Sequence, residues 1–146
     1  MLKNLLVKSA NQNDLNDIAI FENKFFLNDA YSIASLYQMF NDANYEIVIV
    51  EYEQKNIGYL IYMKTIDFNE ILKIGVDENY RNLKVGSVLI DLLKQKKQNI
   101  LLEVSSINEN ALNFYLKRGF IKQSIRKKYY ADNSDAILMI WKYNTQ

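Results

Sequence analysis

The chain of 146 residues is 49% hydrophobic and 24% charged, with a net charge of +1, which is typical of one soluble globular domain spanning residues 1–146. It contains no cysteine and no histidine, which excludes disulfides, thiolate or imidazole metal sites and Ser-His-Asp hydrolases. Any proton transfer must therefore use carboxylates, tyrosines, lysines or water, and we expect no metal cofactor. The sequence has no cleavage-site pattern near residue 1 and no apolar run of membrane-spanning length, so we expect a cytoplasmic protein that binds no membrane.

Alternating and helix-spaced hydrophobic residues predict the elements in chain order. Asn13 is placed to cap a first helix, and Asn28 or Asp29 to begin a second. Helix-spaced apolar residues predict a strong third helix from Val85, and Asn108 is placed to cap a short fourth helix before Gly119. Strands are expected over residues 5–9, 45–52, 57–64, 71–76, 100–104, 120–129 and 136–143.

The order of these elements is β-α-α-β-β-β-α-β-α-β-β. The strand–helix–strand crossover between residues 71 and 104 requires at least one parallel pair of strands, while the remaining connections suit antiparallel neighbours. The sequence therefore predicts an α/β (α+β) protein with one mixed sheet.

Charge is unevenly distributed along the chain. Residues 1–80 carry 12 acidic and 6 basic side chains, whereas residues 81–128 carry 11 basic and 3 acidic ones. A basic block after an acidic half favours an anionic ligand bound by the second part. A solvated helix face with a charged loop would give the same totals. Nucleic acid is a further alternative, but the basic residues form no single stripe and no nucleic-acid motif accompanies them, so we expect no nucleic-acid partner.

The polar segment of residues 77–84 joins a predicted strand to the N-terminus of the third helix. Free backbone N–H groups and the helix dipole make such a terminus a site for anions. Gly86 would let a phosphate approach the backbone closely, and Arg81 and Lys84 add positive charge. The segment therefore predicts a phosphate-binding loop.

A second motif follows the strand of residues 100–104 and consists of Asn108, Ala111, Tyr115 and Gly119-Phe120. Together with the run Arg81-Asn82-Leu83-Lys84-Val85-Gly86, it resembles the GCN5-related N-acetyltransferase (GNAT) superfamily, whose pyrophosphate loop reads Gln/Arg-x-x-Gly-x-Gly/Ala. The resemblance covers essentially the whole chain and implies the GNAT fold, with a mixed, mostly antiparallel sheet of about seven strands and about four helices, and acetyl-CoA as co-substrate. It implies that acetyl-CoA contacts Ile74, Gly75, Val76, Arg81, Asn82, Leu83, Lys84, Val85, Gly86, Ser87, Asn108 and Tyr115.

Within that superfamily, the chain resembles the bacterial ribosomal-protein-alanine N-acetyltransferases, which acetylate the α-amine of a small-subunit ribosomal protein that begins with Ala. The positions that carry this resemblance are Leu102-Glu103-Val104, Asn108, Tyr115, Ile125-Arg126-Lys127-Lys128-Tyr129-Tyr130 and Asp135-Ala136. The resemblance implies Glu103 as the general base and Tyr115 as the general acid. It also implies that the Val76 N–H stabilises the oxyanion and that Tyr129 and Tyr130 line the entrance for the acceptor peptide.

The chain departs from the family pattern at two places. Lys84 stands where the loop has its first glycine, so its Cβ could hinder a phosphate or its amine could add charge. Leu27-Asn28 stands where the second helix of the family begins with an aromatic residue and Ser.

Two further functions stay open at this point. One is a GNAT enzyme that acts on another amine, such as a polyamine, an aminoglycoside or a lysine. The other is an acyl-CoA-binding module without turnover, which Lys84 favours and the presence of Glu103 and Tyr115 opposes. The sequence does not indicate the oligomeric state.

Overall fold

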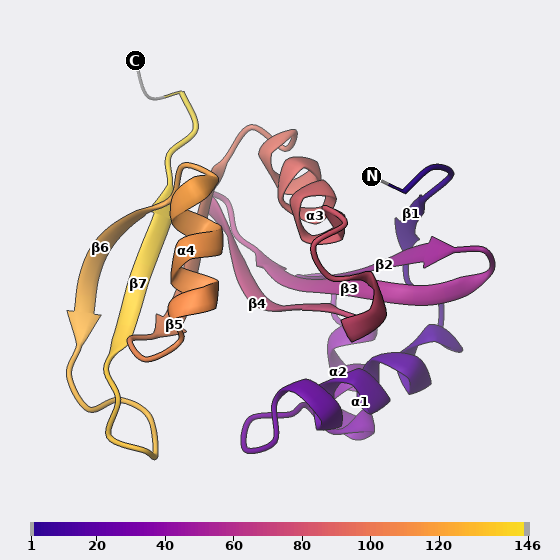
Figure 1. Ribbon diagram of the computed structural model, residues 1–146, viewed down its shortest axis with the longest axis horizontal. Coiled ribbons are helices and arrows are strands. Elements are labelled where there is room, and N and C mark those ends of the chain that lie inside the picture. The colour runs from indigo at the N-terminus through magenta and orange to yellow at the C-terminus, as the bar shows by residue number, and fades with distance from the viewer. Residues whose placement is uncertain (1, 145–146) are drawn as a thin grey trace.

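The computed structural model describes residues 2–144 and contains one seven-stranded sheet in the order β1-β2-β3-β4-β5-β7-β6 (Figure 1). β4 and β5 are parallel, and the other neighbouring strands are antiparallel. The predicted mixed α/β class is therefore confirmed. The elements are β1 (Leu6–Ser9), α1 (Asp14–Phe25), α2 (Ile33–Phe40), β2 (Tyr45–Tyr52), β3 (Lys55–Lys64), β4 (Phe68–Val76), the 3₁₀ turn η1 (Glu78–Tyr80), α3 (Val85–Lys94), β5 (Asn99–Ser105), α4 (Glu109–Lys117), β6 (Ile121–Arg126) and β7 (Ala136–Trp141).

Helices cover both faces of the sheet and bury two separate apolar cores. Helices α3 and α4 pack on one face, where Leu89, Leu93 and Tyr115 join residues of β3, β4, β5 and β7. Helices α1 and α2 pack on the other face, where Leu15 and Leu36 meet residues of β2 and β3. Because successive strand residues point to opposite faces, the buried strands carry apolar side chains on both sides.

β4 and β5 separate beyond a short stretch of pairing, and this separation positions the candidate site. Their parallel ladder joins Phe68–Ile71 to residues 99–102, after which β4 continues to Val76 and β5 to Ser105. The pairing of β3 with β4 is irregular at the same point, because Tyr62 opposes Ile71 while Ile61 opposes Lys73. Leu72 is thus an extra residue on β4, and such a bulge bends a strand away from its neighbour. Figure 1 shows β4 running toward α3 while β5 runs toward α4.

One predicted helix start and one predicted helix cap need correction. The second helix begins at Ile33, after an N-cap Ser32 whose hydroxyl accepts from the Ser35 N–H (3.1 Å), and not at Asn28 or Asp29. The backbone carbonyl of Asp29 instead accepts from Lys73 of β4, a long-range contact that helix periodicity does not reveal.

Asn13 does precede the first helix, but its side chain makes no capping bond within residues 2–144. The neighbouring Asn11 supplies that cap, since its Oδ1 accepts from the Asp14 N–H (3.1 Å) and its own N–H donates to Asp14 Oδ2 (2.9 Å). Asn and Asp side chains can both close such a reciprocal cap, so composition alone does not identify the capping residue.

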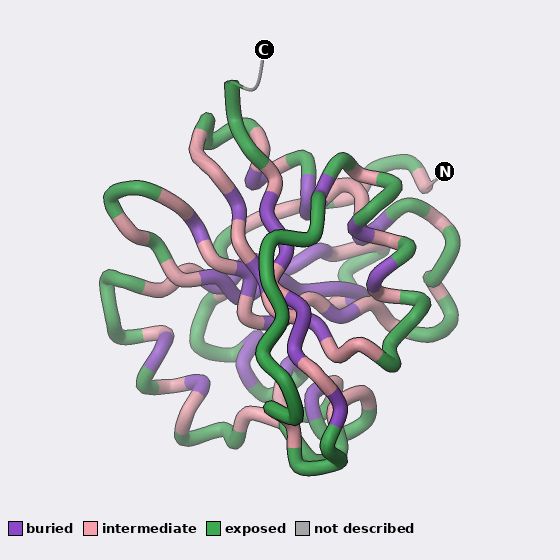
Figure 2. Tube along the Cα trace, turned by 90° about the vertical axis from the view of Figure 1, so that its left-hand side faces the viewer, coloured by how far each residue is buried: buried purple, intermediate pink, exposed green. Residues whose placement is uncertain are grey.

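The predicted strand over residues 120–129 is also too long. β6 ends at Arg126, so Tyr129 and Tyr130 lie in the loop before β7. β6 is the last strand of the sheet and all six of its residues are exposed (Figure 2). An edge strand of this kind has no neighbour on its outer side, and its end therefore depends on the following loop.

Gly75 leaves room for a buried tyrosine, and replacing it with alanine should destabilise the fold. A Cβ at this position would lie 2.5 Å from Cε1 of the fully buried Tyr59. We expect Gly75→Ala to lower the free energy of unfolding by about 1–3 kcal/mol, as overpacking does. Urea denaturation of a double-mutant cycle with Tyr59→Leu tests this, because the smaller side chain should reduce the penalty. An equal penalty in both backgrounds would contradict the steric explanation.

Candidate active site

A cavity of about 1680 Å³ opens where β4 and β5 separate. It is lined from the α3–α4 face of the sheet by the N-terminus of α3 and by α4, and from the other face by the segment after α1. Among the described residues, every predicted site residue except Leu83 lines it. These are Ile74, Gly75, Val76, Arg81, Asn82, Lys84, Val85, Gly86, Ser87, Glu103, Asn108, Tyr115, Tyr129 and Tyr130.

The free edge of β4 presents backbone groups to this cavity. The Asp77 N–H donates to the carbonyl of Ile57 (2.8 Å), which makes residues 57 and 77 a hydrogen-bonded pair of the β3–β4 ladder. Since hydrogen-bonded pairs alternate in an antiparallel ladder, the N–H and C=O of Ile74 and Val76 point away from β3, toward the gap. The carbonyl of Val76 accepts from Arg81 Nε (3.1 Å). The Val76 N–H points to the same side of the strand, toward the cavity.

The N-terminus of α3 carries a left-handed residue and a packed glycine. Lys84 is the N-cap with a φ of 68°, a conformation that suits glycine and strains a residue with a Cβ. A Cβ on Gly86 would lie 2.9 Å from the Phe114 ring, so this glycine serves the close approach of α4 to α3. Packing against Phe114 is thus a second reason for glycine at this position, beside the close approach of a phosphate that the sequence analysis predicts.

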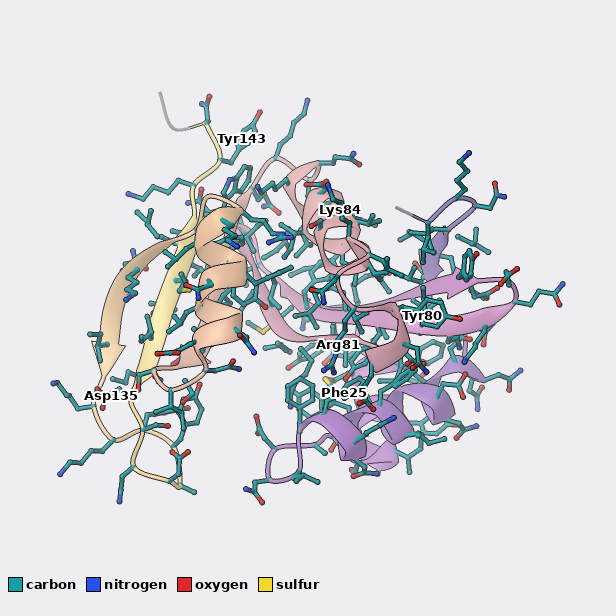
Figure 3. The ribbon with its side chains drawn as sticks, viewed as in Figure 1. Phe25, Tyr80, Arg81, Lys84, Asp135 and Tyr143 are labelled. Atoms are coloured by element: carbon teal, nitrogen blue, oxygen red, sulfur yellow. The ribbon has the colours of Figure 1, made fainter. Side chains whose placement is uncertain are left out.

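Positive side chains gather near this terminus. Arg118 of the α4 C-cap donates from Nε (3.0 Å) and from Nη2 to the Ser87 hydroxyl, and from Nη1 to the carbonyl of Phe114 (2.8 Å). Its guanidinium stacks 3.6 Å from the centroid of the Phe114 ring. Arg81 lies over the Phe25 ring (4.8 Å), and Figure 3 shows it beside that residue, below Lys84. Cations at a helix N-terminus are unfavourable next to the dipole, so the arrangement suits a bound anion.

Glu103 extends from β5 to the other face of the sheet. Its neighbours Leu102 and Val104 are buried in the α3–α4 core, so alternation turns its carboxylate toward the opposite side. Its Oε2 is buried without a hydrogen-bond partner within residues 2–144, and Arg126 Nε lies 3.7 Å away. Burial, and secondly the charge of Glu103, raises the pKa of the nearby Glu70 above its ordinary value. Glu103 is therefore a carboxylate with free acceptor capacity beside the cavity.

Tyr115 lies in the C-terminal half of α4 and is 6% exposed. Its ring packs edge-on against Phe114 (5.1 Å) and Phe120 (5.4 Å). A phenol is protonated at neutral pH at its ordinary pKa, and burial raises the pKa of Tyr115 further, so its O–H is present as a donor. Asn108 caps the same helix, as expected, by accepting from the Ala111 N–H (3.2 Å).

Tyr129 and Tyr130 lie in the loop between β6 and β7, which lines the cavity. Their rings pack edge-on with centroids 5.2 Å apart, and Arg126 lies over Tyr129 (5.4 Å). The loop is fastened to β5 by the bond between the Ser105 and Ser134 hydroxyls (2.9 Å). Burial, followed by the charges of Glu103 and Asp29, raises the pKa of Tyr130, which indicates that its phenol lies within electrostatic reach of both carboxylates.

The sequence analysis missed the wall opposite these tyrosines. Phe25, Phe26, Asn28 and Asp29 line the cavity from the end of α1, and Lys73 lines it from β4. The cluster of aromatic and polar residues at the end of a predicted helix was the available signal. This signal did not predict that the cluster faces the cavity, because the contacts that place these side chains join distant parts of the chain.

The described residues contain neither a membrane-spanning helix nor a cluster of metal-ligating side chains. No helix within residues 2–144 is long and apolar enough to cross a membrane. In the same part of the chain, no three acidic, cysteine or histidine side chains are grouped to hold a metal ion.

The chain belongs to the acetyltransferase (GNAT) family, which it matches over residues 13–120. The family resemblance is thereby confirmed, and the protein is an acetyltransferase. The ribosomal-protein-S18-alanine N-acetyltransferase of Escherichia coli has the same fold, with a TM-score of 0.85 and 23% identity over 97% of this chain and 96% of that one.

Two curated relatives match parts of the chain. An N-alpha-acetyltransferase of Sulfurisphaera tokodaii is 37% identical over 75 residues, which are 47% of this chain and 45% of the relative. A provisionally named [ribosomal protein bS18]-alanine N-acetyltransferase of Bacillus subtilis is 30% identical over 99 residues, which are 64% of this chain and 66% of the relative.

Replacing the strained Lys84 with glycine should stabilise the protein. Glycine adopts a φ of this sign without a Cβ clash, so we expect Lys84→Gly to raise the free energy of unfolding by about 1 kcal/mol in urea denaturation. Asn82 has a similar φ of 64°, and asparagine tolerates this region, so Asn82→Gly is a matched control with a smaller gain. Equal gains at the two positions, or none at Lys84, would show that the N-cap is unstrained.

Proposed function

We propose that this protein transfers the acetyl group of acetyl-CoA to the N-terminal α-amine of a protein, and that its acceptor is a ribosomal protein that begins with Ala. The observation that carries the proposal is the cavity that passes between β4 and β5, since it joins a cationic helix terminus on one face to a carboxylate on the other. A thioester held from one face and an amine held from the other would meet at this gap.

The α3–α4 face has the chemistry needed to hold the cofactor. The N–H groups of α3 and the charges of Arg81, Lys84 and Arg118 suit the phosphates of acetyl-CoA. The exposed backbone edge of β4 at Ile74 and Val76 suits an extended pantetheine chain that pairs as an additional strand. Acetyl-CoA, when bound, supplies an activated thioester carbonyl, and the Val76 N–H would donate to its oxygen as negative charge develops.

The opposite face suits an amine acceptor. An α-amine has an ordinary pKa near ~8, so roughly a tenth is neutral at pH 7, whereas a lysine side chain near ~10.4 is almost entirely protonated. Glu103 would take the proton of the α-ammonium, directly or through a water, at Oε2, which accepts no hydrogen bond within the described residues. Tyr115 would donate its phenolic proton to the departing thiolate and regain one from solvent.

The identity of the acceptor is supported by the curated relatives. Both partly matching relatives carry names that denote N-terminal acetylation, and the Bacillus subtilis one names a ribosomal protein. The side of the cavity that would receive a peptide carries Asp29 and Glu103 together with Tyr129 and Tyr130, which offer acceptor oxygens to an α-ammonium. Each carboxylate also has a cation nearby, since Lys73 Nζ lies 3.4 Å from Asp29 Oδ2 and Arg126 Nε lies 3.7 Å from Glu103 Oε2. A cytoplasmic location, where ribosomal proteins and acetyl-CoA occur together, is part of this proposal.

A peptide panel tests the proposal directly. We expect mass spectrometry to detect transfer from acetyl-CoA to an Ala-starting ribosomal peptide. We expect none to the same peptide with a blocked α-amine, or to a peptide whose free amine is on lysine. Transfer to lysine, a polyamine or an aminoglycoside would overturn the Nα assignment. A rise in melting temperature with acetyl-CoA and no transfer to any amine would favour a binding module.

Removing the proposed general acid should reduce turnover selectively. We expect Tyr115→Phe to lower kcat by about a hundredfold, because positioned proton transfer contributes at least that much. The buried ring stays in place, so the Kd for acetyl-CoA in calorimetry should change less than about twofold. Leu116→Ala is the matched control on α4, since Leu116 is 43% exposed and should leave kcat unchanged. Unchanged turnover in Tyr115→Phe would refute the assigned acid role.

A further inference from the structure

A buried ion pair lies beside the cavity, and the proposed chemistry does not use it. Lys73 Nζ lies 3.3 Å from Glu22 Oε1, and the two side chains are 6% and 0% exposed. Such pairs seldom add net stability, because removing two charges from water costs about as much as their attraction returns. Their use must then be sought in the groups that they hold in place.

The pair fastens the segment between the first two helices, which we call the α1–α2 loop (residues 26–32). Glu22 Oε1 accepts from the Tyr31 N–H (2.9 Å), and its Oε2 accepts from the buried hydroxyl of Tyr59 (2.5 Å). Lys73 Nζ donates to the backbone carbonyl of Asp29 (2.5 Å). Two backbone points of the loop are thus bonded to a charge pair that is rooted in α1 and β4.

Lys73 also fixes an aromatic side chain of this loop. Its Nζ lies 3.9 Å from the centroid of the Phe26 ring and 5.1 Å from that of Tyr31, distances at which a cation is attracted to a ring face. Phe26 lines the cavity together with Asp29, whereas Leu27 between them is 83% exposed. The exposed Leu27 adds no packing at the tip of the loop. The Phe26 ring is held by Lys73, while the Phe26 backbone N–H donates to the Glu22 carbonyl (2.9 Å).

Lys73 neighbours the reacting end of the cavity as well. It precedes Ile74, whose backbone groups point into the gap between β4 and β5, while its own side chain extends to the α1–α2 face. One residue of β4 thus connects the strand edge that would hold the acetyl group to the loop that would face the acceptor.

We infer that Glu22 and Lys73 are positioning residues that hold the α1–α2 loop, and with it the Phe26 ring, as the wall against which the first side chain of the acceptor packs. The inference rests on the proposed function, because it assumes that the acceptor enters between this loop and Tyr129–Tyr130. A wall held in one place excludes bulky first residues, whereas a loosened wall admits them.

Kinetics of charge-removing variants test the inference. Lys73→Met leaves Glu22 buried and unpaired and can fail to fold, so the double variant Glu22→Gln/Lys73→Met, which removes both charges, is made beside it. We expect the KM for an Ala-starting peptide to rise about tenfold and the preference for Ala over Leu as first residue to fall about tenfold. The KM for acetyl-CoA should stay within about twofold, because its binding groups lie on the other face.

Lys64→Met is the matched control. Lys64, like Lys73, is a strand lysine paired with a glutamate, since its Nζ lies 3.3 Å from Glu46 Oε2. That pair is more exposed than Lys73–Glu22 and does not line the cavity. This variant should leave both KM values and the first-residue preference unchanged. A folded double variant with a lower melting temperature, but with unchanged peptide KM and preference, would overturn the inference and leave the pair a merely stabilising role.

A readout without an acceptor separates this inference from the proposed function. Amide hydrogen exchange of residues 26–32 should quicken by about tenfold or more in the double variant, while β2 and β3 keep their protection. Quickened exchange in a protein whose wild type acetylates no peptide would refute the proposed function but keep the held loop. Unchanged exchange of the loop would refute the positioning role, whatever the wild type acetylates.

Discussion

The separation of β4 from β5 is the constraint on which the rest of the site depends. Parallel strands normally continue their ladder, because unpaired backbone groups are costly to bury. Here the extra residue Leu72 on β4 and the end of pairing at Ile71 turn the strand toward α3. The unpaired edge at Ile74 and Val76 is then available to a ligand, and the gap connects the two faces of the sheet.

Packing and charge around the gap include features that are unfavourable by themselves, namely backbone strain and cations beside a helix N-terminus. Lys84 occupies a left-handed conformation, and Arg118 is held against the α3 N-terminus by Ser87 and by the Phe114 ring. Burial also lowers the pKa of Arg118 below its ordinary value, as expected for a cation that is partly removed from water. A bound anion would reduce the repulsion between these cations. Their position at the α3 N-terminus accounts for part of the excess of basic residues over residues 81–128.

The sequence predicted the architecture well because the architecture depends on local signals. Hydrophobic periodicity located the strands and helices, and the Asn108 cap and the β4–β5 crossover followed from short patterns. The wall of the cavity near Phe26 did not follow, since it depends on contacts between Glu22 or Asp29 and Lys73. The start of α2 was missed although Ser32 supplies a local cap, because Lys73 draws the earlier candidate Asp29 out of the helix. Pairings between residues so distant in the chain leave no periodic trace.

Because the sequence contains no histidine, the proposed reaction would rely on a tyrosine on one side of the gap and a carboxylate on the other for proton transfer. Burial raises the pKa of the Tyr115 phenol on the α3–α4 side. On the other side, Glu103 Oε2 accepts no hydrogen bond within the described residues and lies 3.7 Å from Arg126 Nε. In the proposed reaction, Tyr115 and Glu103 would not need to exchange protons with each other, because each would need only its own reactant and solvent. An α-amine, which loses its proton easily, suits a carboxylate base better than a lysine would. The proposed reaction would thus divide between Glu103 and Tyr115 the proton transfers for which enzymes often use a histidine.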